Sequence, residues 1–239
     1  MNIWTGEIRE DRGTQSNSVF SRELWVERQL ESLRQYLKQL DSSSLPVYPP
    51  RYSTLPLIFP TIDVRRLLDY GGGNGWTFYH LQNVANTENL ESYWVLENKE
   101  LVSKIKHSFA PKIKLTYSHM LPQEYVDLVY ANSVLQYVED KDFFAVVNST
   151  SPQFVLIDNF LANSKNFYTE QNFYSEKINV KFRDLNLFSD AMRLHGYEKI
   201  WVSPYYSFVL GSFQGLKTEN FPPEYRIDRS FSLLFERLD

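Results

Sequence analysis

One segment near the start of the chain has hydrophobic residues at helical spacing. Five apolar residues recur there at alternating steps of four and three: Val26, Leu30, Leu33, Leu37 and Leu40. Such a stripe, with charged and amide side chains around it, predicts an amphipathic helix over 19–41. The pattern leaves three roles open for this helix: packing on the main domain, covering a site as a lid, or forming an interface, including one between two copies of the chain.

The segment after this helix is rich in proline. Residues 42–60 carry five of the 11 prolines of the chain, namely Pro46, Pro49, Pro50, Pro56 and Pro60. Because proline lacks an amide hydrogen and fixes φ, a regular helix or central strand is excluded here. We therefore expect a connector, with an N-terminal extension over 1–60 and a main domain over 61–239. The polar residues 1–18 either are loose or dock on that domain.

From residue 62 onward, short apolar runs alternate with more polar segments. The runs that predict strands are VRRLLDY, SYWVLEN, KIKLTYS, YVDLVYANS, QFVLIDNF, YEKIWVSP and SFSLLFERL. Helices are predicted between them at 75–86, 98–108, 139–148 and 186–195. This alternation predicts βαβ units and an α/β fold with a mostly parallel sheet. The last two runs have no helix between them, which fits an antiparallel pair with 205–228 as an insertion.

Composition narrows the class of protein. The 239 residues suit one large domain, with 43% hydrophobic and 23% charged residues. Without cysteine, disulfides, thiolate ligands and cysteine nucleophiles are excluded. The net charge of -4 and the scattered basic residues predict no nucleic-acid partner. No signal-peptide pattern and no apolar run of roughly 18 residues is present, so we expect a cytoplasmic protein without a membrane partner.

A glycine-rich turn follows the first predicted strand. Asp69 stands at the end of that strand, and four of the nine glycines follow at Gly71, Gly72, Gly73 and Gly75. Glycine permits positive φ and lets a ligand approach the backbone, and the predicted helix start adds free N–H donors.

Two common glycine-rich motifs fit this turn poorly. A nucleotide-binding P-loop needs Lys followed by Ser or Thr after the last glycine, where Trp76 and Thr77 stand. In the dinucleotide fingerprint the third glycine would be Trp76 or Phe78, whose rings obstruct close packing of helix on strand. A nicotinamide-dependent oxidoreductase is therefore the least favoured alternative.

The stretch resembles motif I of the class I S-adenosylmethionine-dependent methyltransferases, in which an acid precedes three alternating glycines. Asp69, Gly71, Gly73 and Gly75 match it position by position, and the resemblance extends from about residue 63 to the C-terminus. It implies the Rossmann-like class I methyltransferase fold, a mostly parallel seven-stranded sheet flanked by helices, here with an N-terminal helical extension. S-adenosylmethionine would be the cofactor and S-adenosylhomocysteine the product.

A narrower resemblance concerns the substrate. LLDYGGGNG together with SVLQYVED resembles a bacterial group of methyltransferase-like proteins with a D-x-G-G-G-x-G motif, often linked to surface-polysaccharide biosynthesis. This implies methyl transfer by in-line displacement to a small molecule, such as a sugar or another biosynthetic intermediate. The alternative is a catalytically silent cofactor-binding partner or regulatory subunit, with the amphipathic helix as its interface.

The resemblance also implies site residues. Glu97 ends the second predicted strand, and a carboxylate there offers paired acceptors to a ribose diol. The implied cofactor-binding residues are Asp69, Gly71, Gly72, Gly73, Gly75, Glu97, Asn98, Tyr117, Ser118, Asn132 and Ser133, with adenine near 117–119. The residues implied to line the acceptor are Tyr130, Gln136, Tyr137 and Asn159.

A general base would assist transfer to a hydroxyl group. The candidates are His80, His119 and Asp158. Asp158 serves equally well as a strand-end cap, and His80 faces either the pocket or solvent. No pair of histidines or acids has convincing metal-ligand spacing, so we expect no metal ion.

Overall fold

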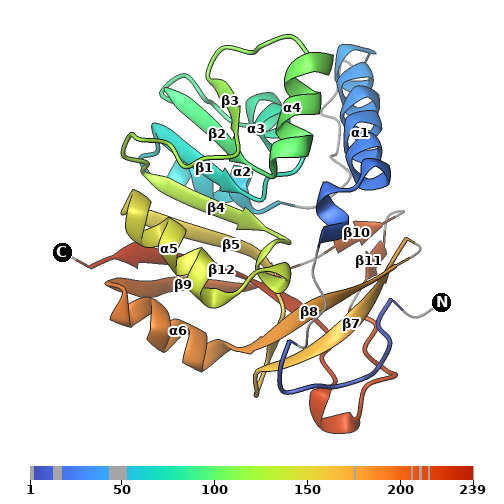
Figure 1. Ribbon diagram of the computed structural model, residues 1–239. Coiled ribbons are helices and arrows are strands. Elements are labelled where there is room, and N and C mark those ends of the chain that lie inside the picture. Colours follow the sequence, from blue (N-terminus) through green and yellow to red (C-terminus); the bar gives the residue numbers. More distant parts are fainter. Residues whose placement is uncertain are drawn as a thin grey trace.

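The computed structural model describes residues 3–12, 18–42, 53–174, 176–205, 207–209, 212–214 and 216–238. Within these ranges the centre of the molecule is a seven-stranded sheet in the order β3-β2-β1-β4-β5-β12-β9 (Figure 1). Its strands are β1 (Arg66–Tyr70), β2 (Ser92–Leu96), β3 (Leu115–Ser118), β4 (Leu128–Asn132), β5 (Phe154–Phe160), β9 (Tyr197–Tyr205) and β12 (Ser230–Arg237).

All seven predicted strands form, and their directions agree with the predicted fold class. Strands β1 to β5 are parallel to one another, whereas β12 lies between β5 and β9 and is antiparallel to both. The sheet is therefore mostly parallel, and the predicted antiparallel pair is β12 with β9. Because parallel strands align their carboxyl ends, the loops after β1, β2 and β4 meet at one edge of the sheet.

Helices connect these strands near the predicted ranges. They are α3 (Trp76–Val84), α4 (Lys99–Ser108), α5 (Asp140–Thr150) and α6 (Leu185–Leu194). Side-chain caps fix two of the starts: Asn98 accepts from the Leu101 N–H at 3.0 Å, and Asp184 caps α6 in the same way. The segment VLQYVED joins β4 to α5. It forms a single 3₁₀ turn, η3 (Leu135–Tyr137), before α5 begins at Asp140.

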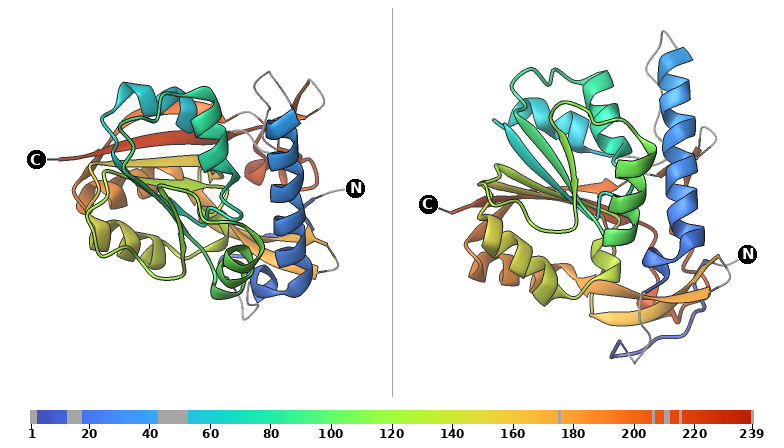
Figure 2. Two further views of the ribbon diagram at one scale, coloured as in Figure 1. Left: turned by 90° about the horizontal axis from the view of Figure 1, so that it is seen from above. Right: turned by 45° about the horizontal axis from the view of Figure 1, so that its top comes forward.

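The sheet separates two hydrophobic cores. One contains the buried side chains of α1, α3 and α4, including Leu30, Phe78 and Ile105. The other contains those of α5 and α6, including Phe143 and Met192. The helices accordingly cover both faces of the sheet (Figure 2).

The N-terminal amphipathic helix packs within the chain. It follows a 3₁₀ turn, η1 (Ser18–Ser21), and spans α1 (Glu23–Ser42) alongside α4. Val26, Leu30 and Leu33 are buried, and Leu37 and Leu40 pack against the same core. The predicted stripe is therefore covered by this chain itself.

The connector forms two short turns where the structure describes it. They are α2 (Leu55–Ile58) and η2 (Phe59–Thr61). Pro56 and Pro60 lie in their first turns, where the missing N–H breaks no helical bond. The other three prolines of the connector, Pro46, Pro49 and Pro50, lie outside the described residues.

A second sheet stands beside the main one, in the order β6-β8-β7. Its strands are β6 (Ala162–Asn163), β7 (Phe167–Phe173) and β8 (Glu176–Asp184). Sequence analysis predicted no strand at the β7–β8 hairpin, although residues 178–183 of β8, INVKFR, alternate apolar and polar side chains as a strand does. In the structure both faces of this part of β8 are buried, including its three polar residues.

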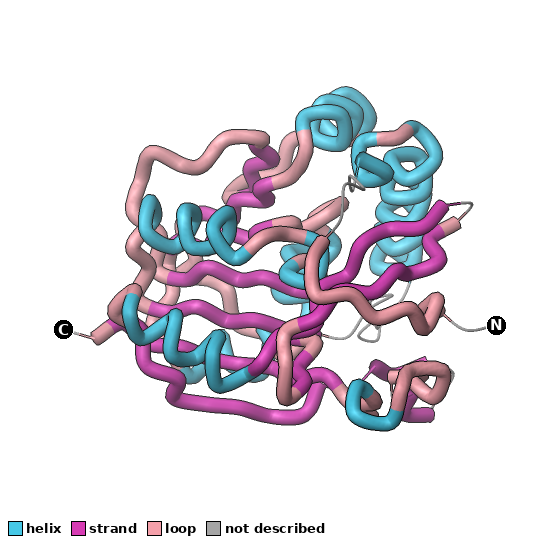
Figure 3. Tube along the Cα trace, turned by 60° about the horizontal axis from the view of Figure 1, so that its bottom comes forward, coloured by secondary structure: helices cyan, strands magenta, loops and turns pink. Residues whose placement is uncertain are grey.

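The start of the chain docks on this hairpin. The Thr5 N–H donates to the Glu170 carbonyl at 2.9 Å, and Arg9 and Tyr168 exchange two backbone hydrogen bonds of 2.8 Å. The N-terminal segment thus runs along β7 (Figure 3). Within the insertion 205–228, the described elements are β10 (Ser207–Val209), β11 (Ser212–Gln214) and η4 (Pro223–Tyr225).

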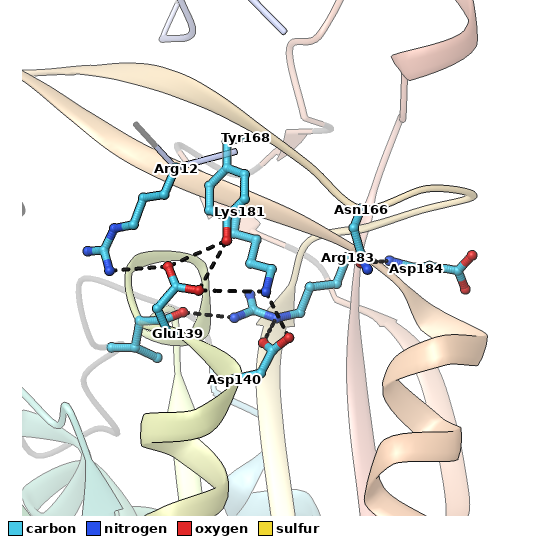
Figure 4. A network of polar contacts seen from close by, with 9 residues as sticks. Arg12, Glu139, Asp140, Asn166, Tyr168, Lys181, Arg183 and Asp184 are labelled. Atoms are coloured by element: carbon cyan, nitrogen blue, oxygen red, sulfur yellow. Dashed lines mark hydrogen bonds and ion pairs between the residues drawn. The ribbon is translucent and has the colours of Figure 1, made fainter. Parts of the chain in front are cut away.

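A polar cluster fixes the hairpin to the start of α5 (Figure 4). Asp140 accepts from Lys181 Nζ and from Arg183 Nε, both at 2.7 Å. Glu139 accepts from Arg12 at 3.1 Å and from the Tyr168 hydroxyl at 3.1 Å. Burial alone raises the pKa of the Asp140 carboxyl, but the charge of Arg183 and the bonds from both cations outweigh burial and lower it.

Candidate functional site

A cavity of about 660 Å³ opens at the carboxyl ends of β1, β2 and β4. The sheet edge supplies Asp69, Tyr70, Gly71, Gly72, Gly73, Asn74, Leu96, Glu97, Asn98, His119, Asn132, Ser133 and Val134. Helices, turns and the hairpin supply Phe20, Trp25, Arg28, Gln29, Ser32, Trp76, Thr77, Tyr137, Val138, Phe173 and Tyr174. This is the edge at which open α/β sheets bind ligands.

The glycine turn brings bare backbone to the cavity. Gly73 has a φ of 58°, and the nearest atom to a Cβ built there is the Gln29 Oε1 atom at 3.2 Å. Gly75 also has a positive φ, but it lies behind the cavity, where the Tyr117 phenol fills the space of any side chain. Of the predicted cofactor glycines, 71 to 73 face the cavity and Gly75 shapes the turn.

Asp69 lies on the cavity floor but is almost fully enclosed, with 1% of its surface exposed. The Tyr93 hydroxyl donates to its Oδ2 atom at 2.7 Å. Burial raises the pKa of the Asp69 carboxyl to about 7, and the charge of Glu97 adds to this rise, against the Tyr93 hydrogen bond. Asp69 is thus close to gaining or losing a proton at neutral pH.

Glu97 stands at the end of β2 beside the glycine turn. Its Oε2 atom accepts from the Asn98 backbone N–H at 2.7 Å and from Asn98 Nδ2 at 2.9 Å. Burial raises the pKa of the Glu97 carboxyl, partly offset by backbone hydrogen bonds from Asn98 and Gly73. Asn98 Nδ2 also donates to the Phe20 carbonyl at 3.0 Å, which links β2 to the turn before α1.

A chain of hydrogen bonds fixes the polar groups at the ends of β4 and β5. Ser133 Oγ donates to Asn132 Oδ1 at 2.9 Å and accepts from Asn159 Nδ2 at 2.9 Å. Ser133 and Asn159 both have positive φ, at 57° and 58°. Such backbone strain in non-glycine residues is typical of functional sites. Asn132 and Ser133 line the cavity, whereas Asn159 supports them from outside the lining.

Asp158 lies in the interior, apart from the cavity lining, with 1% of its surface exposed. It accepts hydrogen bonds from the Thr54 N–H at 2.7 Å, the Ser232 hydroxyl at 2.7 Å and the Tyr130 hydroxyl at 2.9 Å. Burial raises the pKa of this carboxyl, against these bonds. The geometry is that of a strand-end cap that holds the connector, because Thr54 of the connector is among its partners.

The three residues at the end of β3, Tyr117, Ser118 and the following His119, have separate surroundings. Tyr117 donates to the Asn74 carbonyl at 2.8 Å beneath the glycine turn and lies outside the cavity lining. Ser118 Oγ is occupied by Met120, donating to its carbonyl at 2.6 Å and accepting from its N–H at 3.0 Å. His119 lines the cavity.

His80 lies outside the cavity lining on α3, with its ring centroid 6.4 Å from that of Trp76. Its Nδ1 atom is buried and has no hydrogen-bond partner among the described residues. Burial lowers the pKa of His80, which favours the neutral imidazole. A helix position close in sequence to the glycine turn therefore does not bring its side chain into the site.

Of the residues predicted to line the acceptor, some line the cavity and others lie outside it. Tyr137 lines the cavity and donates to Gln171 Oε1 on β7 at 3.0 Å. Tyr130 and Gln136 are buried outside the lining. Tyr130 is held there because its hydroxyl accepts from Asn132 Nδ2 at 2.8 Å and donates to Asp158.

The sequence left a lid role open for α1 but did not indicate which of its residues would face the site. Trp25, Arg28, Gln29 and Ser32 of α1 line the cavity, at the three- and four-residue spacing of one helical face. Phe173 and Tyr174 at the end of β7 complete the wall. The helical spacing of the α1 residues is a sequence signal that could have identified them. Phe173 and Tyr174 could not be placed beside the cavity without knowing that β7 pairs with β8.

The described residues contain neither a candidate metal site nor a candidate membrane-spanning helix. Among the described residues, no three His, Asp or Glu side chains gather to hold a metal ion. None of the described helices combines the length and apolar character needed to cross a membrane.

Comparison by sequence yields no relative: no protein-family model matches the chain, and a search of curated proteins finds no match. Comparison by structure gives 307 matching chains. One is a candidate S-adenosylmethionine-dependent methyltransferase from Listeria monocytogenes, at a TM-score of 0.53 and 10% identity. The match covers 77% of this chain and 98% of that one.

Two further structures match most of the chain. The Burkholderia thailandensis 1,6-didemethyltoxoflavin-N1-methyltransferase, with its substrate and S-adenosylhomocysteine bound, is 9% identical at a TM-score of 0.53, covering 97% of this chain and 95% of its own. The glycopeptide N-methyltransferase MtfA, with S-adenosylhomocysteine bound, is 9% identical at a TM-score of 0.53. The match covers 85% of this chain and 96% of MtfA. The chain therefore has the Rossmann-like fold of these methyltransferases.

Proposed function

We propose that the protein is an enzyme that binds S-adenosylmethionine in this cavity and transfers its methyl group to a small molecule. The observation that carries the proposal is the joint placement of Glu97 and the glycine backbone of 71–73 at the ends of adjacent parallel strands. Paired carboxylate acceptors suit a ribose diol, and open backbone suits the chain attached to it. The cavity volume lies in the range of roughly 300–1,000 Å³ usual for small-molecule sites.

The chemistry of the lining fits that cofactor. When bound, S-adenosylmethionine supplies an electrophilic methyl group on a positively charged sulfur. Asp69 and Glu97 make the floor acidic, and Trp76 offers an aromatic face in the lining. The remaining lining residues would position the acceptor and exclude water. Positioning of the two reactants supplies much of the rate in such transfers. Covering of the cavity by α1 serves that exclusion.

For a hydroxyl acceptor, His119 is the candidate general base. Of the three bases that the sequence suggested, it is the one that the cavity lining contains, since His80 and Asp158 lie outside. A sugar or another biosynthetic intermediate, including one of surface-polysaccharide synthesis, stays the predicted acceptor. A silent cofactor-binding subunit with α1 as its interface is less favoured, because the apolar stripe of α1 is already buried in this chain.

Calorimetry with S-adenosylhomocysteine, S-adenosylmethionine, NADH and NADPH tests the proposal. We expect micromolar binding of both sulfur compounds and none of the dinucleotides. Glu97→Gln should weaken binding about 10- to 100-fold, the effect of losing a charge-assisted hydrogen bond of about 1.5–3 kcal/mol. The matched control is Glu100→Gln, which changes an exposed acid in the first turn of α4. Failure of both sulfur compounds to bind would overturn the proposal.

A further inference from the structure

The part of the cavity wall that comes from outside the main sheet is rich in aromatic side chains. Phe20 lies at its centre, with ring centroids 4.9 Å from Tyr137, 5.5 Å from Trp25 and 5.5 Å from Phe173. These rings come from four separate elements: η1, α1, η3 and β7. All four line the cavity, so a bound molecule meets flat apolar faces there.

One guanidinium group lies within this aromatic part. The Arg28 Cζ atom is 4.2 Å from the centroid of the Tyr174 ring, in cation–π contact. Arg28 and Tyr174 both line the cavity. A guanidinium that rests against a ring keeps the N–H donors of its edge available, in the fork geometry that matches a carboxylate or a phosphate.

Arg28 differs from the arginines beside it. Arg22 forms an ion pair with Glu176, and Arg34 forms one with Glu31. For Arg28 the described part of the chain provides no acidic partner. Arg28 therefore stands in the cavity lining without an acidic partner among the described residues.

The charges of the lining are separated. The acids Asp69 and Glu97 belong to the strand ends, while Arg28 belongs to the aromatic part. An anionic group would be repelled by the two acids and attracted by the guanidinium. A ligand with a flat ring and a negative group therefore has one favourable placement, with the ring on the aromatic residues and the anion on Arg28.

We infer that the methyl acceptor is a cyclic small molecule that carries a carboxylate or phosphate group, and that Arg28, supported by Tyr174, selects it. This rests on the proposed function, because the acceptor must lie beside the bound cofactor. The one competing source of the same chemistry is the carboxylate of the cofactor itself. The two sources are separable, since only an acceptor anion would bind to protein already saturated with S-adenosylhomocysteine.

The test measures binding of matched pairs to the protein saturated with S-adenosylhomocysteine. One pair is 4-hydroxybenzoate and 4-hydroxybenzamide, and the other is glucose 6-phosphate and glucose. We expect the anion of at least one pair to bind about 10-fold or more tightly than its neutral partner. Which pair responds distinguishes an aromatic from a sugar ring. Equal affinity within both pairs, or no binding of either anion, would overturn the inference.

Substitutions test whether Arg28 causes the preference for the anionic ligand. Arg28→Gln should abolish the preference for the anion, and Arg28→Lys should restore part of it, because Lys keeps the charge but loses the fork. Arg34→Gln is the control, since Arg34 is on the same helix and outside the lining. Selectivity that survives in Arg28→Gln would contradict the inference.

A cofactor role for Arg28 gives a different result. In that case Arg28→Gln would weaken S-adenosylhomocysteine and leave 5′-methylthioadenosine, which lacks the carboxylate, unaffected. That outcome would overturn the acceptor assignment and leave the proposed function standing. If the unaltered protein did not bind S-adenosylhomocysteine, the proposed function itself would be refuted.

Discussion

The phenol of Tyr117 occupies the space that a side chain on Gly75 would need. Its hydroxyl donates to the carbonyl of Asn74 at 2.8 Å, so β3 holds the end of the glycine turn in place. Gly75 has a φ of 75° and is the residue from which α3 starts. The last glycine of the motif is therefore required by the packing of the turn on β3, behind the surface that a ligand contacts.

Alanine at Gly75 should be far more damaging than alanine at another glycine of similar conformation. Gly196 has a φ of 86°, but no described atom lies within 4 Å of a Cβ built there. Gly196→Ala should therefore cost only the backbone strain, about 1–2 kcal/mol. Gly75→Ala adds a steric clash and should lower the free energy of unfolding by about 3 kcal/mol or more. Urea unfolding of both variants measures the difference; equal losses would show that Tyr117 moves aside easily.

The raised pKa of Asp69 predicts a specific pH dependence of stability. Its folded pKa of about 7 exceeds the unfolded value of 3.8, so between these values the folded state binds more protons. Stability from this group is present below pH 4 and is lost as the pH rises to about 7, by on the order of 4 kcal/mol at most. Asp69→Asn should flatten that decline in urea unfolding at pH 4.5 and 7.5. An unchanged slope would refute an elevated pKa.

The same group predicts proton release on cofactor binding. Placing a cationic ammonium or sulfonium near Asp69 favours its ionised form and lowers its pKa. At pH 6.5 we expect S-adenosylmethionine to displace up to about one proton. Calorimetry in buffers of different ionisation enthalpy counts the protons, and Asp69→Asn should release none. Equal release by both proteins would assign the proton to another group.

Asp158 is expected to matter for stability. Asparagine there has one acceptor oxygen where the carboxylate has two, so it would direct an N–H toward donors of Thr54, Ser232 or Tyr130. We expect Asp158→Asn to lower the free energy of unfolding by about 2–4 kcal/mol. Asp190→Asn, an exposed acid on α6, is the control. If Asp158→Asn kept full stability and lost only activity, a catalytic role would be indicated instead.

The cluster at Asp140 should hold the hairpin that carries Phe173. Because the folded pKa of Asp140 is lowered, its contribution is present above pH 4 and is lost as the pH falls through the folded value. Asp140→Asn should cost about 1 kcal/mol at pH 7, a modest value because the carboxylate is partly exposed. Amide exchange should quicken in β7 and β8. Asp142→Asn on the same helix turn is the control and should change neither.

Much of the fold was determined by local sequence pattern. The seven apolar runs became the seven strands of the main sheet, and four helical ranges agreed to within a few residues. The acid, the glycine turn and Glu97 were also placed correctly at the sheet edge. These features follow from strand length, residue alternation and chain order, all of which act over short distances in the sequence.

Tertiary packing alone decided which side chains reach the cavity. Asp158 and His80 are near the site in sequence terms, yet one is turned inward to Thr54 and the other lies outside the lining beside Trp76. Arg28 is distant in sequence but is brought there by α1, because its helix buries an apolar face on α4. The sequence by itself determined the sheet and the glycine turn. The direction of each side chain and the meeting of α1 with the hairpin depend on long-range contacts, which periodicity does not encode.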